Sequence, residues 1–143
     1  LGAIPGVYIM RWAALRSDYV TEHGVRVVMN DVAVCNPANI KVWEDELLSF
    51  WAKSYPAEKI VAAVDGTYLV CKPVERIELS WTDRIFRGYS NGRVAVIGSR
   101  GDDVEYTHSL FKHEVSHNVL TGLGIPFNEA KQHELFTKAG LGA

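Results

Sequence analysis

The feature that most constrains the fold is a predicted helix, from about Glu105 to Thr121, that is apolar around most of its circumference. Its apolar side chains point in several directions and are Leu110, Phe111, Val115, Val119 and Leu120. Other elements have to cover such a helix on most sides. Gly122 is expected to end it at the C′ position, and Gly124 and Pro126 keep the following chain out of helix. We therefore expect this helix to lie inside a packed fold.

Three further helices are predicted along the chain. Residues Ile9 to Val20 resemble a helix, and the apolar residues between Val42 and Lys53 recur at three and four positions, as on an amphipathic helix. A last helix is expected from Glu129 to Ala139, because Asn128 is a good N-cap and Gly140 can close the C-terminus.

Short runs rich in valine, isoleucine and tyrosine predict the strands, which are Val25–Met29, Ile60–Val64, Thr67–Cys71, Val74–Leu79 and Val94–Ile97. Asp65-Gly66 is a candidate hairpin turn. Asn91-Gly92 is a stronger one, of type I′, leading into Arg93–Ile97. The order predicts an α+β fold with the late helices packed on a sheet, and one domain over residues 1–143.

Composition excludes several classes of protein. Hydrophobic residues make up 48% and charged residues 22% of the 143 residues, as in ordinary globular chains, and the net charge of −2 offers no broad attraction for nucleic acid. The apolar stretch Ala3–Leu15 is interrupted by Pro5 and Arg11 and is too short to span a membrane. Cys35 and Cys71 form one disulfide or stay separate thiols, and two residues do not decide between these.

His113, Glu114 and His117 form an HExxH pattern inside the apolar helix. Histidines four residues apart project from one face, so one ion can bridge both rings. Neutral imidazoles suit Zn²⁺, and Glu114, roughly 100° further around the helix, can reach a zinc-bound water without binding the metal. On a buried helix each unpaired polar group costs about 1–3 kcal/mol, and a metal satisfies all of them. The pattern predicts a zinc site with Glu114 as catalytic base for amide hydrolysis.

A catalytic zinc site usually has three protein ligands, so a third has to come from elsewhere in the chain. The tight connection Gly122–Phe127 lets the last helix lie near the first, with His133 in its middle. Glu129 or Glu134 are alternative ligands, and we favour His133. Phe136 is expected to pack beneath the site, and Glu129 is a candidate acceptor for the other ring N–H of His133.

At these residues the chain resembles the zincin metallopeptidases, whose signature is HExxH with the glutamate acting on the zinc-bound water. The segment HEVSHNVLTGLGIPFNEAKQHELF is also similar to the SprT-like branch, in which a third histidine is followed by an aromatic, as His133 is by Phe136. Glu134 departs from that branch, which usually has glycine there. The resemblance covers about the last 40 residues. It implies a small mixed sheet whose edge strand lies over the cleft, with the motif helix packed beneath.

These observations predict a zinc metallopeptidase in which His113, His117 and His133 hold the metal and Glu114 activates water. An exposed edge strand binds an extended peptide by main-chain hydrogen bonds, and Val94–Ile97 is the candidate strand. Two alternatives stay open. One is a non-catalytic binding or regulatory module whose structural metal is closed by Glu129 or Glu134, and the other is a zinc hydrolase acting on a different bond. The sequence does not indicate the oligomeric state.

Overall fold

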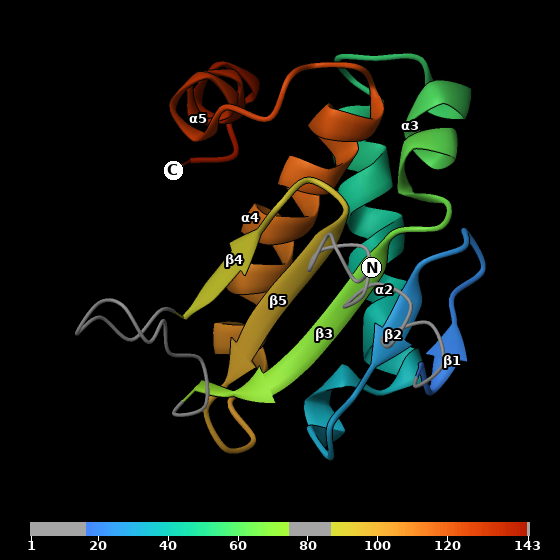
Figure 1. The fold of residues 1–143 in the computed structure, drawn as a ribbon, viewed down its shortest axis with the longest axis vertical. Helices are drawn as coiled ribbons and strands as arrows, with labels where there is room; N and C mark the ends of the chain where they lie inside the picture. Colours follow the sequence, from blue (N-terminus) through green and yellow to red (C-terminus); the bar gives the residue numbers. More distant parts are fainter. Residues whose placement is uncertain (1–16, 75–86, 143) are drawn as a thin grey trace, which may run out of the picture.

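The computed structural model describes residues 17–74 and 87–142, which form a five-stranded mixed sheet and four α-helices (Figure 1). The strands are β1 (Tyr19–Val20), β2 (Arg26–Val28), β3 (Tyr68–Pro73), β4 (Gly88–Ser90) and β5 (Val94–Ser99). The helices are the 3₁₀ turn η1 (Ala33–Cys35), α2 (Pro37–Trp51), α3 (Ala57–Val64), α4 (Val104–Gly122) and α5 (Glu129–Ala139). The predicted α+β class is confirmed.

The sheet has the strand order β1-β2-β3-β5-β4. Strands β2, β3 and β5 run parallel to one another, and β1 and β4 are antiparallel strands at the two edges. Side chains alternate between the faces, so Leu69 and Ile97 join the main core while Tyr68 and Val96 form a smaller cluster on the opposite face. The two clusters show that both faces of β3 and β5 are buried.

The prediction that Val94–Ile97 is an edge strand is wrong. These residues lie in β5, which pairs with β3 on one side and with β4 on the other. The Asn91-Gly92 turn explains the difference, because it closes a hairpin that adds β4 outside β5. Gly92 has φ +92°, but Asn91 is not among the positive-φ residues, so the turn is not of type I′. Within the described residues, β4 is the edge strand next to α4.

Helices α2 and α4 lie on one face of the sheet, behind the strands in Figure 1, and α5 is seen nearly end on beyond α4. The core between them contains the fully buried side chains of Trp51 and Phe111. The Trp51 indole Nε1–H donates to Ser116 Oγ over 2.8 Å, so this buried donor is satisfied across the α2–α4 interface. The motif helix is covered on most sides, as its apolar circumference predicted.

Residues Ile60–Val64 are helical, and the predicted strand there is wrong. Ile60, Ala63 and Val64 are the buried residues of α3, at the spacing of one helical face. The β-branched composition therefore gave the wrong secondary structure. Asp65-Gly66 consequently joins α3 to β3 and is not a hairpin turn.

Two other predictions concern segments that the structure describes only in part. Of the predicted helix Ile9–Val20, residues Tyr19 and Val20 are in strand β1, and the part before residue 17 lies outside the described residues. Of the predicted strand Val74–Leu79, residue 74 follows the end of β3 and residues 75–79 lie outside the described residues.

Helix α4 continues through Gly122, which was expected to lie just beyond its end. A Cβ on Gly122 would be 2.6 Å from both Cβ and O of Ala63 in α3, so glycine allows the two helices to approach closely. The left-handed conformation falls instead on Gly124, with φ +94°.

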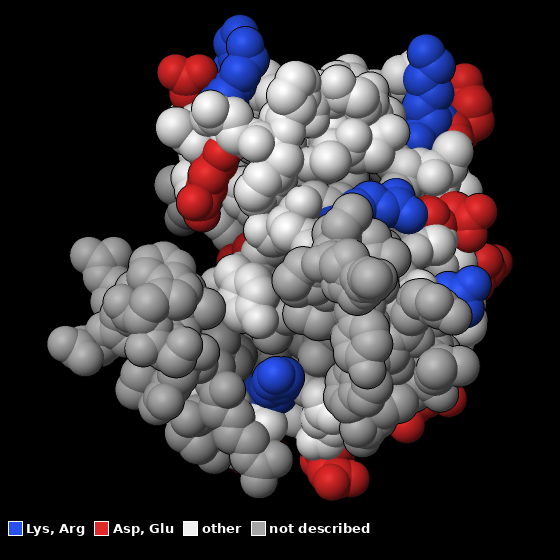
Figure 2. All heavy atoms as spheres, in the orientation of Figure 1, with Lys and Arg blue, Asp and Glu red and all other residues white. Residues whose placement is uncertain are grey.

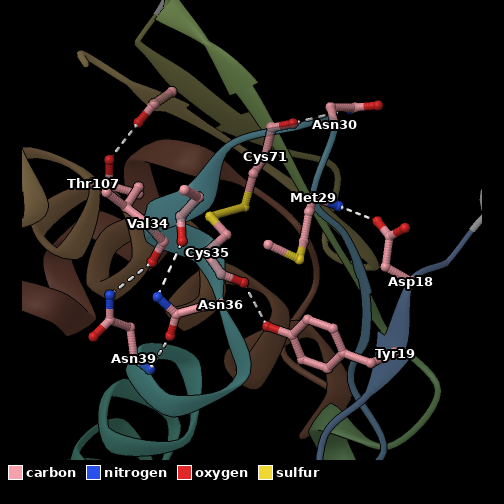
Figure 3. Close-up of a disulfide and its surroundings, with 12 residues drawn as sticks. Asp18, Tyr19, Met29, Asn30, Val34, Cys35, Asn36, Asn39, Cys71 and Thr107 are labelled. Carbon is pink, nitrogen blue, oxygen red and sulfur yellow. Dashed lines mark hydrogen bonds between the residues drawn. A yellow bond between two sulfur atoms is a disulfide. The ribbon is translucent and has the colours of Figure 1, made fainter. Parts of the chain in front are cut away.

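Cys35 and Cys71 are joined by a disulfide that ties η1 to strand β3 (Figure 3). Both residues are fully buried. The backbone carbonyl of each cysteine accepts a hydrogen bond from a neighbouring side chain. Tyr19 Oη–H donates to Cys35 O over 2.6 Å, and Asn30 Nδ2–H donates to Cys71 O over 2.9 Å. The structure thus selects the disulfide from the two states that the sequence left open.

Across residues 17–74 and 87–142, no helix combines the length and the apolar character that crossing a bilayer requires. On the face shown in Figure 2, the described basic and acidic side chains are interspersed and form no broad basic area. That nucleic acid is not a partner stays a prediction.

Candidate metal centre

Helix α4 carries the two histidines of the HExxH pattern toward α5. It begins after Asp103, whose side chain caps it by accepting from the Tyr106 backbone N–H over 3.1 Å. His117 is 1% exposed, and His113 is half-buried one turn before it. Their ring centroids are 5.1 Å apart, as expected for side chains four residues apart on one helix face.

Helix α5 brings the third histidine to the same place. Its bounds, Glu129–Ala139, are those predicted from the sequence, because Asn128 accepts from the Lys131 backbone N–H and Gly140 is left-handed with φ +91°. His133 Nε2 lies 3.1 Å from His113 Nε2 and 3.2 Å from His117 Nε2. The structure therefore brings all three predicted histidines together with their ε-nitrogens converging.

Phe136 forms the floor of this cluster. It is fully buried, and its ring lies 5.2 Å from that of His113, 4.7 Å from His117 and 5.5 Å from His133. Trp51 packs against Phe136 from α2 at 6.0 Å between ring centroids. The predicted position of Phe136 is thus observed: its ring contacts all three imidazoles and is itself packed against Trp51.

The surroundings of His113 and His117 favour the neutral form of their imidazoles. Burial, followed by the neighbouring His117 and His133, lowers the pKa of His113 to about 4, against the opposing charge of Glu129. Burial also lowers the pKa of His117, against the opposing effect of its hydrogen bond to Gln132. Neutral imidazole is the form that binds metals, so these two residues are suited to act as metal ligands near neutral pH.

Glu114 lies beside the histidines in a poorly solvated position. It is 7% exposed, and burial, followed by the charge of Glu129, raises the pKa of its carboxyl to about 7. Gly88 of the edge strand β4 lies directly against it: a Cβ on Gly88 would be 3.2 Å from Glu114 Cγ and 3.4 Å from Oε2. The absence of a side chain at residue 88 leaves room for the carboxylate next to the strand.

Strand β4 is also anchored to α4 beyond Glu114. Ser90 Oγ–H donates to the buried Asn118 Oδ1 over 2.8 Å, and Ser90 Oγ accepts from the Gly92 backbone N–H over 2.9 Å. Asn118 directly follows His117, so the helix that carries the histidines also sets the position of the edge strand.

The two glutamates considered as alternative ligands occupy different positions. Glu134 is exposed on the outer side of α5, where it lines a hollow of about 650 Å³ together with Lys131 and Lys138. Glu129 is 71% exposed, and its Oε1 lies 4.0 Å from His133 Nε2, the nitrogen that faces the other imidazoles. The sequence suggested that Glu129 accepts a hydrogen bond from the outer ring nitrogen of His133. This prediction is wrong, because Glu129 lies nearest to Nε2 instead.

Gln132 is a residue of the site that was not predicted from the sequence. It is fully buried, and its Oε1 lies 2.8 Å from His117 Nδ1. The sequence does contain a sign that Gln132 is buried: it lies four residues before Phe136 and so shares the inward face of α5. A buried amide at that position has to find hydrogen-bond partners.

A second group of potential ligands, Glu22, His23 and Asp45, lies on the surface away from α5. Lys41 Nζ is 3.3 Å from Glu22 Oε1 and 3.2 Å from Asp45 Oδ2, so both carboxylates form ion pairs with the ammonium group of Lys41. We interpret this group as a surface ion-pair cluster.

No family model, curated protein or solved structure matches the chain. The likeness to the zincins therefore depends on the residues of α4 and α5 alone. That these residues bind a metal, and that the metal is zinc, stay predictions.

Proposed function

We propose that this protein is a zinc-dependent hydrolase, and specifically a metallopeptidase. The observation that carries the proposal is the convergence of three imidazole ε-nitrogens from α4 and α5, with the buried carboxylate of Glu114 beside them. A core histidine serving only the fold would not need two further histidines within contact distance.

The donor set fits zinc better than magnesium or calcium. Magnesium and calcium prefer oxygen ligands, whereas neutral imidazole is a good ligand for zinc. In a tetrahedral site with Zn–N bonds of about 2.05 Å, two ligand nitrogens are roughly 3.3 Å apart. The two Nε2 separations measured to His133, 3.1 and 3.2 Å, are close to this value.

A zinc ion held by these residues would polarise a substrate carbonyl and acidify a water molecule. We assign to Glu114 the role of taking the proton from that water, since it follows His113 on the same helix and is not among the converging ligands. The Glu114 carboxylate would accept this proton and then donate it to the leaving amine.

Strand β4 replaces Val94–Ile97 as the proposed peptide-binding edge. Among the described residues it pairs with β5 alone, so its outer edge can form main-chain hydrogen bonds to an extended chain. Gly88 places the backbone of this strand against Glu114, which would bring a bound peptide bond close to the proposed base.

The decisive experiment compares Glu114→Gln with wild type in hydrolysis of denatured casein and of a fluorogenic peptide library by zinc-loaded protein. Loss of a general base should lower kcat by about 10²–10⁴-fold while zinc content and fold are retained. Glu134→Gln is the matched control, because it neutralises a carboxylate on the outer side of α5. Equal hydrolysis by Glu114→Gln and wild type would refute the role of Glu114.

The position of Glu129 favours one alternative function, a module whose metal is structural. Its Oε1 is 4.0 Å from His133 Nε2, so a side-chain rotation would make it a fourth protein ligand. In that case Glu129→Gln would weaken zinc binding strongly, and wild type would hydrolyse neither substrate. The peptidase proposal predicts that Glu129→Gln retains zinc binding.

A further inference from the structure

The buried amide of Gln132 makes hydrogen bonds at both of its ends. On one side its Oε1 is 2.8 Å from His117 Nδ1. On the other side its Nε2 is 3.1 Å from Thr121 Oγ1 and 3.3 Å from the backbone carbonyl oxygens of Ile125 and Pro126. The side chain thus connects the end of α4, the loop before α5 and one imidazole of the cluster.

The partners fix which end of the amide faces His117. Backbone carbonyls can only accept hydrogen bonds, so the NH₂ group has to point toward Ile125 and Pro126. Rotating the amide by 180° would place Oε1 against two carbonyl oxygens and leave the NH₂ group at His117. The acceptor end of Gln132 therefore faces His117.

The acceptor oxygen of Gln132 determines which ring nitrogen of His117 carries the proton. A 2.8 Å contact with an amide oxygen requires Nδ1 to be the donor, so neutral His117 has Nδ1–H and a lone pair on Nε2. We propose that Gln132 is a positioning residue that holds His117 in this tautomer and presets its Nε2 as a metal ligand. The proposal depends on the metal site proposed above.

Among the three histidines, His117 is the one whose ring orientation is most restricted by its surroundings. In the described part of the chain, neither His113 nor His133 has a hydrogen bond at its Nδ1, whereas His117 has one and is 1% exposed. An outer hydrogen bond both selects the tautomer and fixes the plane of the ring. Gln132 also links His117 to the loop carbonyls of Ile125 and Pro126.

The tautomer is measured directly on metal-free wild-type protein with ¹⁵N-labelled histidine. Long-range ¹H–¹⁵N spectra distinguish protonated from unprotonated ring nitrogens, and the pH is kept above the range in which histidines ionise. His117 is expected to show Nδ1–H. Detection of the Nε2–H form as the main species would overturn the proposal, whether or not the protein is an enzyme.

Zinc affinity, measured by chelator competition, tests the effect on the site. Gln132→Met removes the acceptor at similar side-chain length and is expected to weaken zinc binding about 10–100-fold, with a mixed His117 tautomer. Thr121→Val is the matched control: it removes a partner of Nε2, leaves the bond to His117 intact and should change the affinity less than threefold. Equal affinities for Gln132→Met and wild type would overturn the proposal.

Gln132→Glu separates positioning from folding. Glutamate keeps an oxygen toward His117 but loses the donors to Ile125 and Pro126, so we expect lower thermal stability with the Nδ1–H tautomer and zinc binding kept. Zinc binding as weak as in Gln132→Met would indicate a merely structural role and overturn the proposal. If wild type binds zinc tightly but hydrolyses nothing, the peptidase proposal fails while the role of Gln132 stands.

Discussion

Breaking the Cys35–Cys71 disulfide should destabilise the fold by about 4 kcal/mol. The two cysteines are 36 residues apart in sequence. A cross-link of this span removes roughly 13 cal/mol/K of entropy from the unfolded chain, which is close to 3.8 kcal/mol at 25 °C. With an unfolding entropy of about 0.3 kcal/mol/K for a chain of this length, the melting temperature should fall by about 13 °C.

Urea unfolding of oxidised wild type, Cys35→Ala, Cys71→Ala and the double variant tests this estimate. Each single variant already loses the whole cross-link, so the double variant should cost far less than the sum of the two single losses. Wild type under reducing conditions provides the comparison with intact side-chain packing. A loss below about 1 kcal/mol, or losses that simply add, would refute the reasoning that the link acts on the unfolded chain.

Three further predictions concern packing and charge. Gly122→Ala should lower stability by about 1–3 kcal/mol in thermal unfolding, because its Cβ would meet Ala63 at 2.6 Å; an unchanged melting temperature would contradict the close approach of α3 and α4. Phe136→Ala should cost about 3–5 kcal/mol in urea unfolding of metal-free protein, and Phe136→Leu clearly less; equal losses would argue against a tightly packed aromatic floor. Burial raises the pKa of Glu44 above its usual 4.5, so the folded state binds the carboxyl proton more tightly than the unfolded state does. The contribution of Glu44 to the free energy of unfolding is therefore greatest below pH 4.5 and is lost as the pH rises through the raised pKa. Glu44→Gln should therefore gain stability relative to wild type between pH 4.5 and pH 8, and a pH-independent difference would show that the carboxyl is not perturbed.

Local signals in the sequence predicted the elements that carry the site. Helix α5 has the predicted bounds because a capping asparagine and a left-handed glycine act within a few residues. His113 and His117 share a face because the helical period requires it. Gly124 and Pro126 indicated a short loop in which the chain reverses. That reversal predicted that His133 lies near His113 and His117.

Predictions failed where the outcome depends on distant partners. Ile60–Val64 has the composition of a strand, but its burial against neighbouring helices makes one helical face the favourable solution. Val94–Ile97 could not be distinguished from an edge strand, because the order of strands in a sheet depends on non-local pairing. Gln132 was missed for a similar reason: its partners are a histidine in another helix and the carbonyls of a loop.

The measurement that tests the metal centre most directly is a crystal structure of the zinc-loaded protein with anomalous diffraction recorded at the zinc edge. We expect a single strong anomalous peak within about 2.0–2.1 Å of Nε2 of His113, His117 and His133. A peak at Glu22, His23 and Asp45 with none between α4 and α5, or no peak in the presence of ample zinc, would contradict it.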